Sequence, residues 1–150
     1  RIAMRNLFLL IALCCVAFSV RAQRQVEVGK GFSSTSVNTT VFRNNSIVPH
    51  GNTQYISYYD AEGWLMLGKR RLGTGEWILH RTQYKGHVKD AHNIISMMVD
   101  GDGYLHLSFA RHGHKLNYCR SIAPDKLVLG DKEPMIGYEE EDVTYPEFHL

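Results

Sequence analysis

The sequence predicts an all-β protein that forms part of a β-propeller, and three observations support this. Short runs of apolar, β-branched and aromatic residues alternate with turns rich in Gly and Asp, the pattern of antiparallel hairpins. Each repeated unit holds three such runs, and the second unit follows the first after 40 residues. A period near forty with several short strands per unit is typical of propeller blades. On strand pattern alone, a β-sandwich remains the alternative.

The two units are predicted strand by strand. In the first unit we expect strands at 54–59, 64–70 and 76–80, and in the second at 93–99, 104–110 and 116–121. Their first turns align, with Asp60 over Asp100, and both fit the pattern D-x-x-G-[WY]-L-x-L. This internal match favours the propeller over the sandwich.

The chain divides into three segments on composition. Residues 1–22 resemble a signal peptide, residues 23–47 form a polar lead-in with one expected strand around 36–42, and residues 48–150 hold the blades. A propeller needs at least about four blades. The 128 residues after the leader hold about two and a half at this period. We therefore expect an N-terminal fragment of a larger propeller.

The signal-peptide prediction depends on an apolar run at 7–20 that follows Arg1 and Arg5, and on the small residues Val20 and Ala22 before the expected cleavage site. This run is too short to cross a bilayer comfortably. The predicted location is therefore secreted or periplasmic, without a stable membrane span. Cys119 is then the one cysteine of the mature chain, which excludes an internal disulfide and predicts a buried thiol.

Charge excludes one class of partner. The chain of 150 residues has 44% hydrophobic and 21% charged residues, within the ordinary globular range. Its formal charge is only +2, and removal of the predicted leader leaves 14 basic against 15 acidic side chains. A nucleic-acid binder is expected to carry a strongly basic surface. We therefore predict no nucleic-acid partner.

Histidines supply the candidate chemistry. Five of the eight lie between His87 and His114. His92 stands at the start of a predicted strand and His112 just past the end of the next, so an antiparallel hairpin returns both to one edge. An imidazole exchanges protons near neutral pH, which suits general acid/base catalysis. Zinc binding by His87, His92, His112 and His114 and a purely hydrogen-bonding role are the alternatives.

Several separated motifs together resemble a known family. They are Asp90-Ala91-His92-Asn93, the run from Asp100 to Leu107, His112 with Leu116-Asn117-Tyr118, and Thr144-Tyr145-Pro146-Glu147-Phe148. With these motifs in this order, residues 48–149 resemble the BNR-repeat propeller family that includes ulvan lyases and related polysaccharide lyases.

The resemblance implies a seven-bladed propeller that cleaves an acidic, uronate-containing polysaccharide by β-elimination. It implies that His92 is the leading acid/base group and that His112 contacts the uronate or shares in proton transfer. Asn93 would support the substrate or the neighbouring histidine. A tyrosine and an arginine from later blades complete the family's site, and no residue here matches them. No organic cofactor is implied, while a structural metal ion and the oligomeric state are left open.

The match has departures, and other functions compete with it. Phe109-Ala110-Arg111 stands where the family often has Gly-Asn-Met, and His114 offers an alternative to His112. The competing functions are a non-catalytic carbohydrate-binding propeller and a sialidase-like glycoside hydrolase. A hydrolase of that kind depends on a carboxylate and an arginine triad that this sequence does not show.

Overall fold

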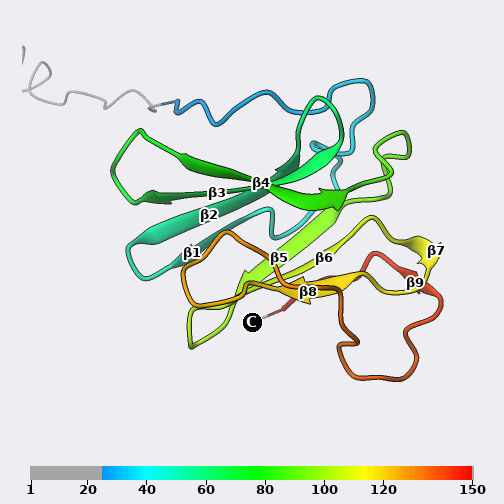
Figure 1. Cartoon of the computed structure of the whole chain (residues 1–150). Helices are drawn as coiled ribbons and strands as arrows, with labels where there is room; N and C mark the ends of the chain where they lie inside the picture. Colours follow the sequence, from blue (N-terminus) through cyan, green and yellow to red (C-terminus); the bar gives the residue numbers. More distant parts are fainter. Residues whose placement is uncertain (1–24, 150) are drawn as a thin grey trace, which may run out of the picture.

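The computed structural model describes residues 25–149, so the predicted signal peptide at 1–22 lies outside the described residues. The described part forms nine β-strands and no helix, arranged in three antiparallel sheets (Figure 1). Accordingly, it holds no helix long and apolar enough to cross a membrane. The predicted all-β class is confirmed.

The first sheet has four strands in the order β1-β2-β3-β4. Its strands are β1 (Ile47–His50), β2 (Thr53–Tyr59), β3 (Trp64–Arg71) and β4 (Ile78–Lys85). In β3 the buried side chains alternate, with Leu65 and Leu67 fully buried and Met66 between them partly exposed. This alternation follows from the two-residue period of a strand, which directs one side-chain set into the core.

The second sheet has the order β5-β6-β8, and a small third sheet pairs β7 with β9. These strands are β5 (Ile95–Val99), β6 (Leu105–Phe109), β7 (His112–His114), β8 (Tyr118–Arg120) and β9 (Val143–Thr144). One hydrophobic core joins the two larger sheets, and Tyr59, Ile95, Met97 and Leu107 are each fully buried in it. Figure 1 shows β7 and β9 together at one end of the molecule.

The aligned turns of the two units have the same structure. In the first, Asp60 Oδ1 accepts hydrogen bonds from the backbone N–H groups of Glu62 and Trp64, both at 2.9 Å. In the second, Asp100 Oδ1 accepts from residues 102 and 104 at 3.0 and 2.9 Å. The final glycine of each turn, Gly63 or Gly103, has φ near +85°, at 84° and 87°. Glycine tolerates this conformation, which explains the D-x-x-G spacing.

One strand prediction was wrong, and another had the wrong bounds. Residues 36–42 form turns instead of a strand, because the Asn38 side chain replaces a strand ladder. Its Nδ2 donates to the Tyr59 carbonyl at 2.8 Å and its Oδ1 accepts from the Tyr59 N–H at 2.9 Å. The last strand of the first unit begins at Ile78 and runs to Lys85, where 76–80 was expected. Cys119 is fully buried, as predicted, and burial raises the pKa of its thiol to about 12.

Candidate functional site

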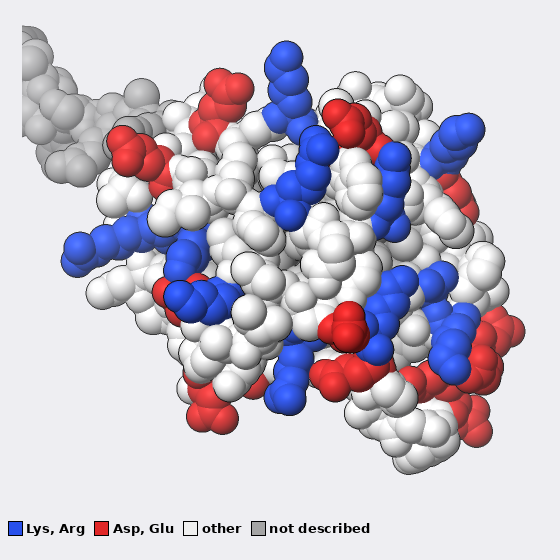
Figure 2. Space-filling view, viewed as in Figure 1, with Lys and Arg blue, Asp and Glu red and all other residues white. Residues whose placement is uncertain are grey.

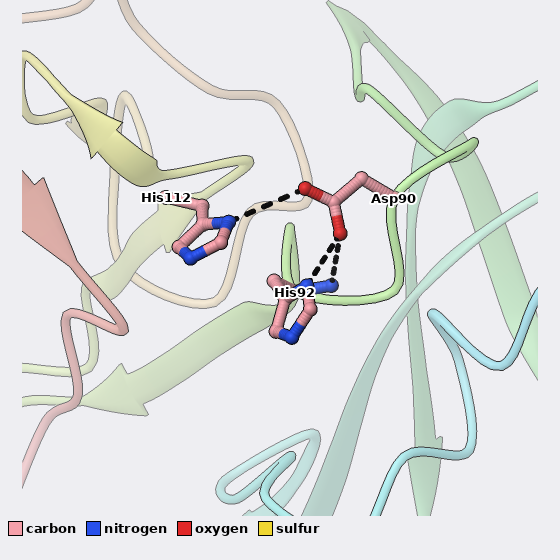
Figure 3. Close-up of side chains that lie close together, drawn as sticks. All are labelled: Asp90, His92 and His112. Atoms are coloured by element: carbon pink, nitrogen blue, oxygen red, sulfur yellow. Dashed lines mark hydrogen bonds and ion pairs between the residues drawn. The ribbon is translucent and has the colours of Figure 1, made fainter.

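Three polar side chains converge at the end of the second sheet. Figure 3 shows Asp90 between His92 and His112, with one carboxylate oxygen directed toward each ring. Oδ1 of Asp90 lies 2.6 Å from Nδ1 of His92, and Oδ2 lies 3.3 Å from Nδ1 of His112. All three side chains are half-exposed, between 42% and 45%. The structure therefore brings the two predicted histidines together and adds a carboxylate between them.

A tight loop before β5 positions the first half of the site. The Asp90 carboxylate also accepts the backbone N–H of His92 at 3.0 Å, an Asx-type turn that fixes both residues relative to each other. Asn93 is buried, and its amide points at the backbone carbonyls of His87 and Asp90, at 3.3 and 3.5 Å. Asn93 thus holds the loop closed from beneath, and its role toward a substrate stays a prediction.

A change of strand pairing positions the second half. The β5–β6 register ends at Ile95 with Phe109, and one further bond joins the Ala110 N–H to the Ile94 carbonyl at 3.1 Å. Ala110 has φ of +52°, a left-handed conformation that turns the chain away from β5. The residues that follow form β7, which pairs with β9 instead. His112 is thereby released from the second sheet and set beside His92.

Aromatic rings surround the two histidines. The His92 and His112 rings stack with centroids 4.5 Å apart, and Tyr145 stacks on His112 at 5.6 Å. Phe42 stacks on His92 at 5.6 Å and contacts Tyr145 at 5.1 Å. Phe42 comes from the lead-in and Tyr145 from just after β9, so distant segments close around the pair. Tyr145 has φ of +52° and is 39% exposed.

The electrostatics favour an ionised Asp90. Its pKa is lowered to about 2, chiefly by the backbone N–H of His92 and then by the His92 ring. An ionised carboxylate only accepts hydrogen bonds, so each imidazole presents Nδ1–H to it. The Nε2 atom of a neutral ring is then the free acceptor. This arrangement orients two proton-exchanging nitrogens away from the shared carboxylate.

The same donor set fits a metal ion. One ligand atom each from Asp90, His92 and His112 lies within 4.8 Å of the others. Three protein ligands with an open position are typical of catalytic zinc sites. Of the four histidines offered as alternative zinc ligands, His87 is not in this group, and the His114 Nδ1 donates to the His112 carbonyl at 2.8 Å. The candidate metal ligands are therefore Asp90, His92 and His112, and not the four histidines named from the sequence.

Sequence reasoning missed Asp90, Phe42 and Tyr145 as members of the site. Asp90 carried a local signal, since an Asp two residues before a His favours an Asx-type turn. Phe42 and Tyr145 carried none, because only the packing of distant segments brings their rings to the histidines.

The fold and the site define a repeat-built all-β protein of the propeller class, with an exposed histidine pair at the edge of its second blade. Residues 53–150 match the model of a family described as BNR repeat-containing, and the chain belongs to this family. No curated protein matches the chain.

Solved structures support the fold. The chain is similar to an ulvan lyase of polysaccharide lyase family PL25, with 17% identity and a TM-score of 0.51, over 61% of this chain and 26% of that one. It is also similar to a PL25 ulvan lyase bound to -[GlcA(1-4)Rha3S]-, with 16% identity and a TM-score of 0.54, over 71% and 28%. The chain thus spans about a quarter of the length of these structures, as a partial propeller.

Proposed function

We propose that this chain carries the acid/base histidines of a polysaccharide lyase that cleaves a uronate-containing polymer by β-elimination. One observation carries the proposal: Asp90 binds Nδ1 of both His92 and His112 and leaves two stacked, half-exposed rings with free Nε2 atoms. The predicted signal peptide fits a polymeric substrate outside the cell.

The reaction needs a base and an acid near each other. The base removes the proton at C5, alpha to the uronate carboxylate, and the electron pair of that C–H bond forms the C4–C5 double bond. The C4–O bond breaks, its electron pair stays on the leaving oxygen, and an acid protonates that oxygen. We assign the base to Nε2 of His92 and a substrate-contacting or proton-transferring role to His112.

Asp90 suits this chemistry as a positioning residue. Its charge stabilises an imidazolium that forms when His92 takes a proton, and its two oxygens fix the orientation of both rings. A further arginine that neutralises the uronate carboxylate, together with a tyrosine, is expected from later blades of the family's propeller. The bound sugar named for one of the similar structures contains a glucuronate, which supports the substrate class.

A non-catalytic carbohydrate-binding propeller is the second candidate. The exposed rings of Phe42 and Tyr145 beside the histidines favour it, because aromatic rings offer flat apolar faces to sugars. In that case the histidines would donate and accept hydrogen bonds without exchanging protons with the substrate.

The deciding experiment incubates the full-length protein with ulvan and other uronate polymers and follows the ultraviolet absorbance of the new C4–C5 double bond. Elimination predicts a steady rise with at least one polymer. Affinity electrophoresis of the same protein on the same polymers is run in parallel. Retarded migration without any rise in absorbance would favour the binding module. If the protein shows no rise and no retarded migration, both candidates are contradicted.

A further inference from the structure

A further pocket adjoins the chain segment that carries His112. A cavity of about 340 Å³ is bordered by Arg111, by the segment 115–117 that follows β7, and by the segment 132–134 that follows β8. None of the rings stacked on His112 borders it. Figure 2 shows basic and acidic side chains gathered at the lower right of the molecule, over the region that holds β7, β9 and the loop between β8 and β9 in Figure 1.

Two cations of this pocket have no acidic partner. Within residues 25–149, neither Arg111 nor Lys132 has a carboxylate oxygen within 4.0 Å, whereas Lys115 is paired with Glu141 at 2.7 Å. Lys132 instead lies over the rings of Tyr84 and Phe109, at 5.3 and 5.4 Å. Contact with ring faces orients the ammonium without neutralising its charge.

The acidic side chains at the pocket are engaged elsewhere. Oε1 of Glu140 accepts three backbone N–H groups from residues 135–137, at 2.8, 2.6 and 3.0 Å. Oε1 of Glu133 lies 3.5 Å from Nε of Arg120. Both carboxylates already accept hydrogen bonds or pair with another cation, so neither forms an ion pair with Arg111 or Lys132.

These cations are held at a cost in stability. Nε of Arg111 is buried, and no group of residues 25–149 forms a hydrogen bond with it. Partial burial lowers the pKa of Lys132, and the nearby charge of Arg111 lowers it further. A desolvated, unpaired donor and two like charges both disfavour the folded state. An anion in the pocket would offset both penalties.

We propose that Arg111 and Lys132 form a subsite for an anionic group of the polysaccharide, a carboxylate or a sulfate ester, next to the sugar at the histidines. This inference rests on the proposed function and adds a specificity determinant to it. Arg111 immediately precedes His112, so the two subsites share one stretch of backbone. A polymer that crosses the segment 111–117 can place neighbouring sugar units in both.

The first test uses inorganic anions and does not depend on any polymer. Thermal unfolding of the full-length protein is followed with sodium sulfate, sodium acetate or sodium chloride at equal ionic strength. The double variant Arg111→Met/Lys132→Met is compared with Arg71→Met/Lys126→Met, which removes two exposed cations outside the pocket. General salt effects are common to all variants, so only the pocket separates them.

We expect sulfate or acetate to raise the unfolding temperature of the wild type and the control more than that of the pocket variant. Without these anions, the pocket variant should be at least as stable as the wild type, because methionine removes the unpaired donor and the repulsion. An equal response of all three proteins to each anion would overturn the subsite.

The second test uses ulvan, its desulfated form and its carboxyl-reduced form in affinity electrophoresis. We expect the pocket variant to bind ulvan about ten- to a hundredfold more weakly than the control, as loss of charge-assisted hydrogen bonds predicts. The derivative that lacks the recognised anion should bind both variants equally. Wild-type affinity of the pocket variant for all three polymers would overturn the proposal. An anion response without any polymer binding would leave the anion subsite standing and contradict the proposed function.

Discussion

The two repeat units share a turn but differ at the opposite end of their first hairpin. In the first unit, β2 and β3 stay paired from Tyr59 with Leu65 to Thr53 with Arg71, and the Leu72 N–H still reaches the Asn52 carbonyl at 2.8 Å. In the second unit, the pairing of β5 with β6 ends at Ile95 with Phe109. One hairpin is closed along its length and the other opens.

The opening creates the candidate site. The 40-residue offset places His92 and His112 where the first unit has Asn52 and Leu72. In the closed hairpin these positions are joined through the backbone, whereas in the open one they are free to carry a stacked pair of imidazoles. The comparison shows that the candidate functional side chains lie where the regular strand pairing of a repeat is interrupted. The turn geometry that both units share keeps the scaffold rigid.

The sharpest test of this comparison replaces the two equivalent residues. His92→Ala should lower the elimination rate of the full-length protein by about a hundred- to ten-thousandfold, the contribution of a general acid or base. Asn52→Ala, at the matching position of the closed hairpin, should leave the rate unchanged. The measurement is the initial rise in ultraviolet absorbance with a uronate polymer. Equal rates for both variants would refute the assignment of the site to the open hairpin.

Asp90→Asn should have the next largest effect, lowering the rate about ten- to a hundredfold. The amide keeps the size of the side chain but loses the charge that stabilises an imidazolium, and it offers a donor to one Nδ1 atom. Native circular dichroism serves as the control for folding. A rate within twofold of the wild type, measured with the same polymer, would contradict the positioning role.

The same variant carries a pH prediction. The folded-state pKa of Asp90, about 2, lies below the ordinary value for an aspartate, which is about 4. Its hydrogen bonds therefore stabilise the fold fully above the ordinary value and are lost as the pH falls toward 2. As the pH falls toward 2, the denaturant midpoint of the wild type should therefore decrease more than that of Asp90→Asn, which has no carboxylate to protonate at this position. The effect should be small, because the side chain is half-exposed.

Local patterns allowed much of this fold to be predicted. The turns at Asp60 and Asp100 are encoded within five residues each, so their repeat was visible and the paired strands followed from it. The histidine pair was also predictable, since a hairpin returns its ends to one edge. The strand expected at 36–42 failed because Asn38 pairs with Tyr59 through its side chain, which no local periodicity reveals.

The remaining parts of the site depend on long-range packing. Tyr145 reaches His112 through the pairing of β7 with β9, a strand of two residues without a sequence signal of its own. Phe42 reaches His92 from turns that were expected to be a strand. In the sequence, Arg111 was notable only as a departure from the family pattern. The lack of a hydrogen-bond partner for its Nε among the described residues depends on how the surrounding segments pack.

The shared turns give a prediction for stability. Asp60→Ala and Asp100→Ala each remove the acceptor of two backbone N–H groups, and each should lower the free energy of unfolding by about 1–2 kcal/mol. Asp60→Ala should cost more, because Asp60 is buried and pairs with Arg81 at 2.6 Å, whereas Asp100 is more exposed and pairs with His106 at 2.9 Å. Urea unfolding measures both values, and Lys89→Ala, at an exposed position outside the turns, tests for effects unrelated to them. Equal stability of wild type and Asp100→Ala would show that the two turns differ in energy despite their common geometry.

The smallest expected effect tests the residue where the second hairpin opens. Ala110 is left-handed, which costs an alanine about 1 kcal/mol, whereas its equivalent Arg70 lies in extended β3. Ala110→Gly should therefore raise the free energy of unfolding by up to about 0.5 kcal/mol, since relief of strain is partly offset by the entropy of glycine in the unfolded chain. Arg70→Gly should lower it by about 1 kcal/mol or more, because glycine weakens a strand interior and the bond to Gln54 is lost. Urea midpoints of both variants decide the matter. Changes of the same sign would mean that the left-handed turn at Ala110 is not what separates the open hairpin from the closed one.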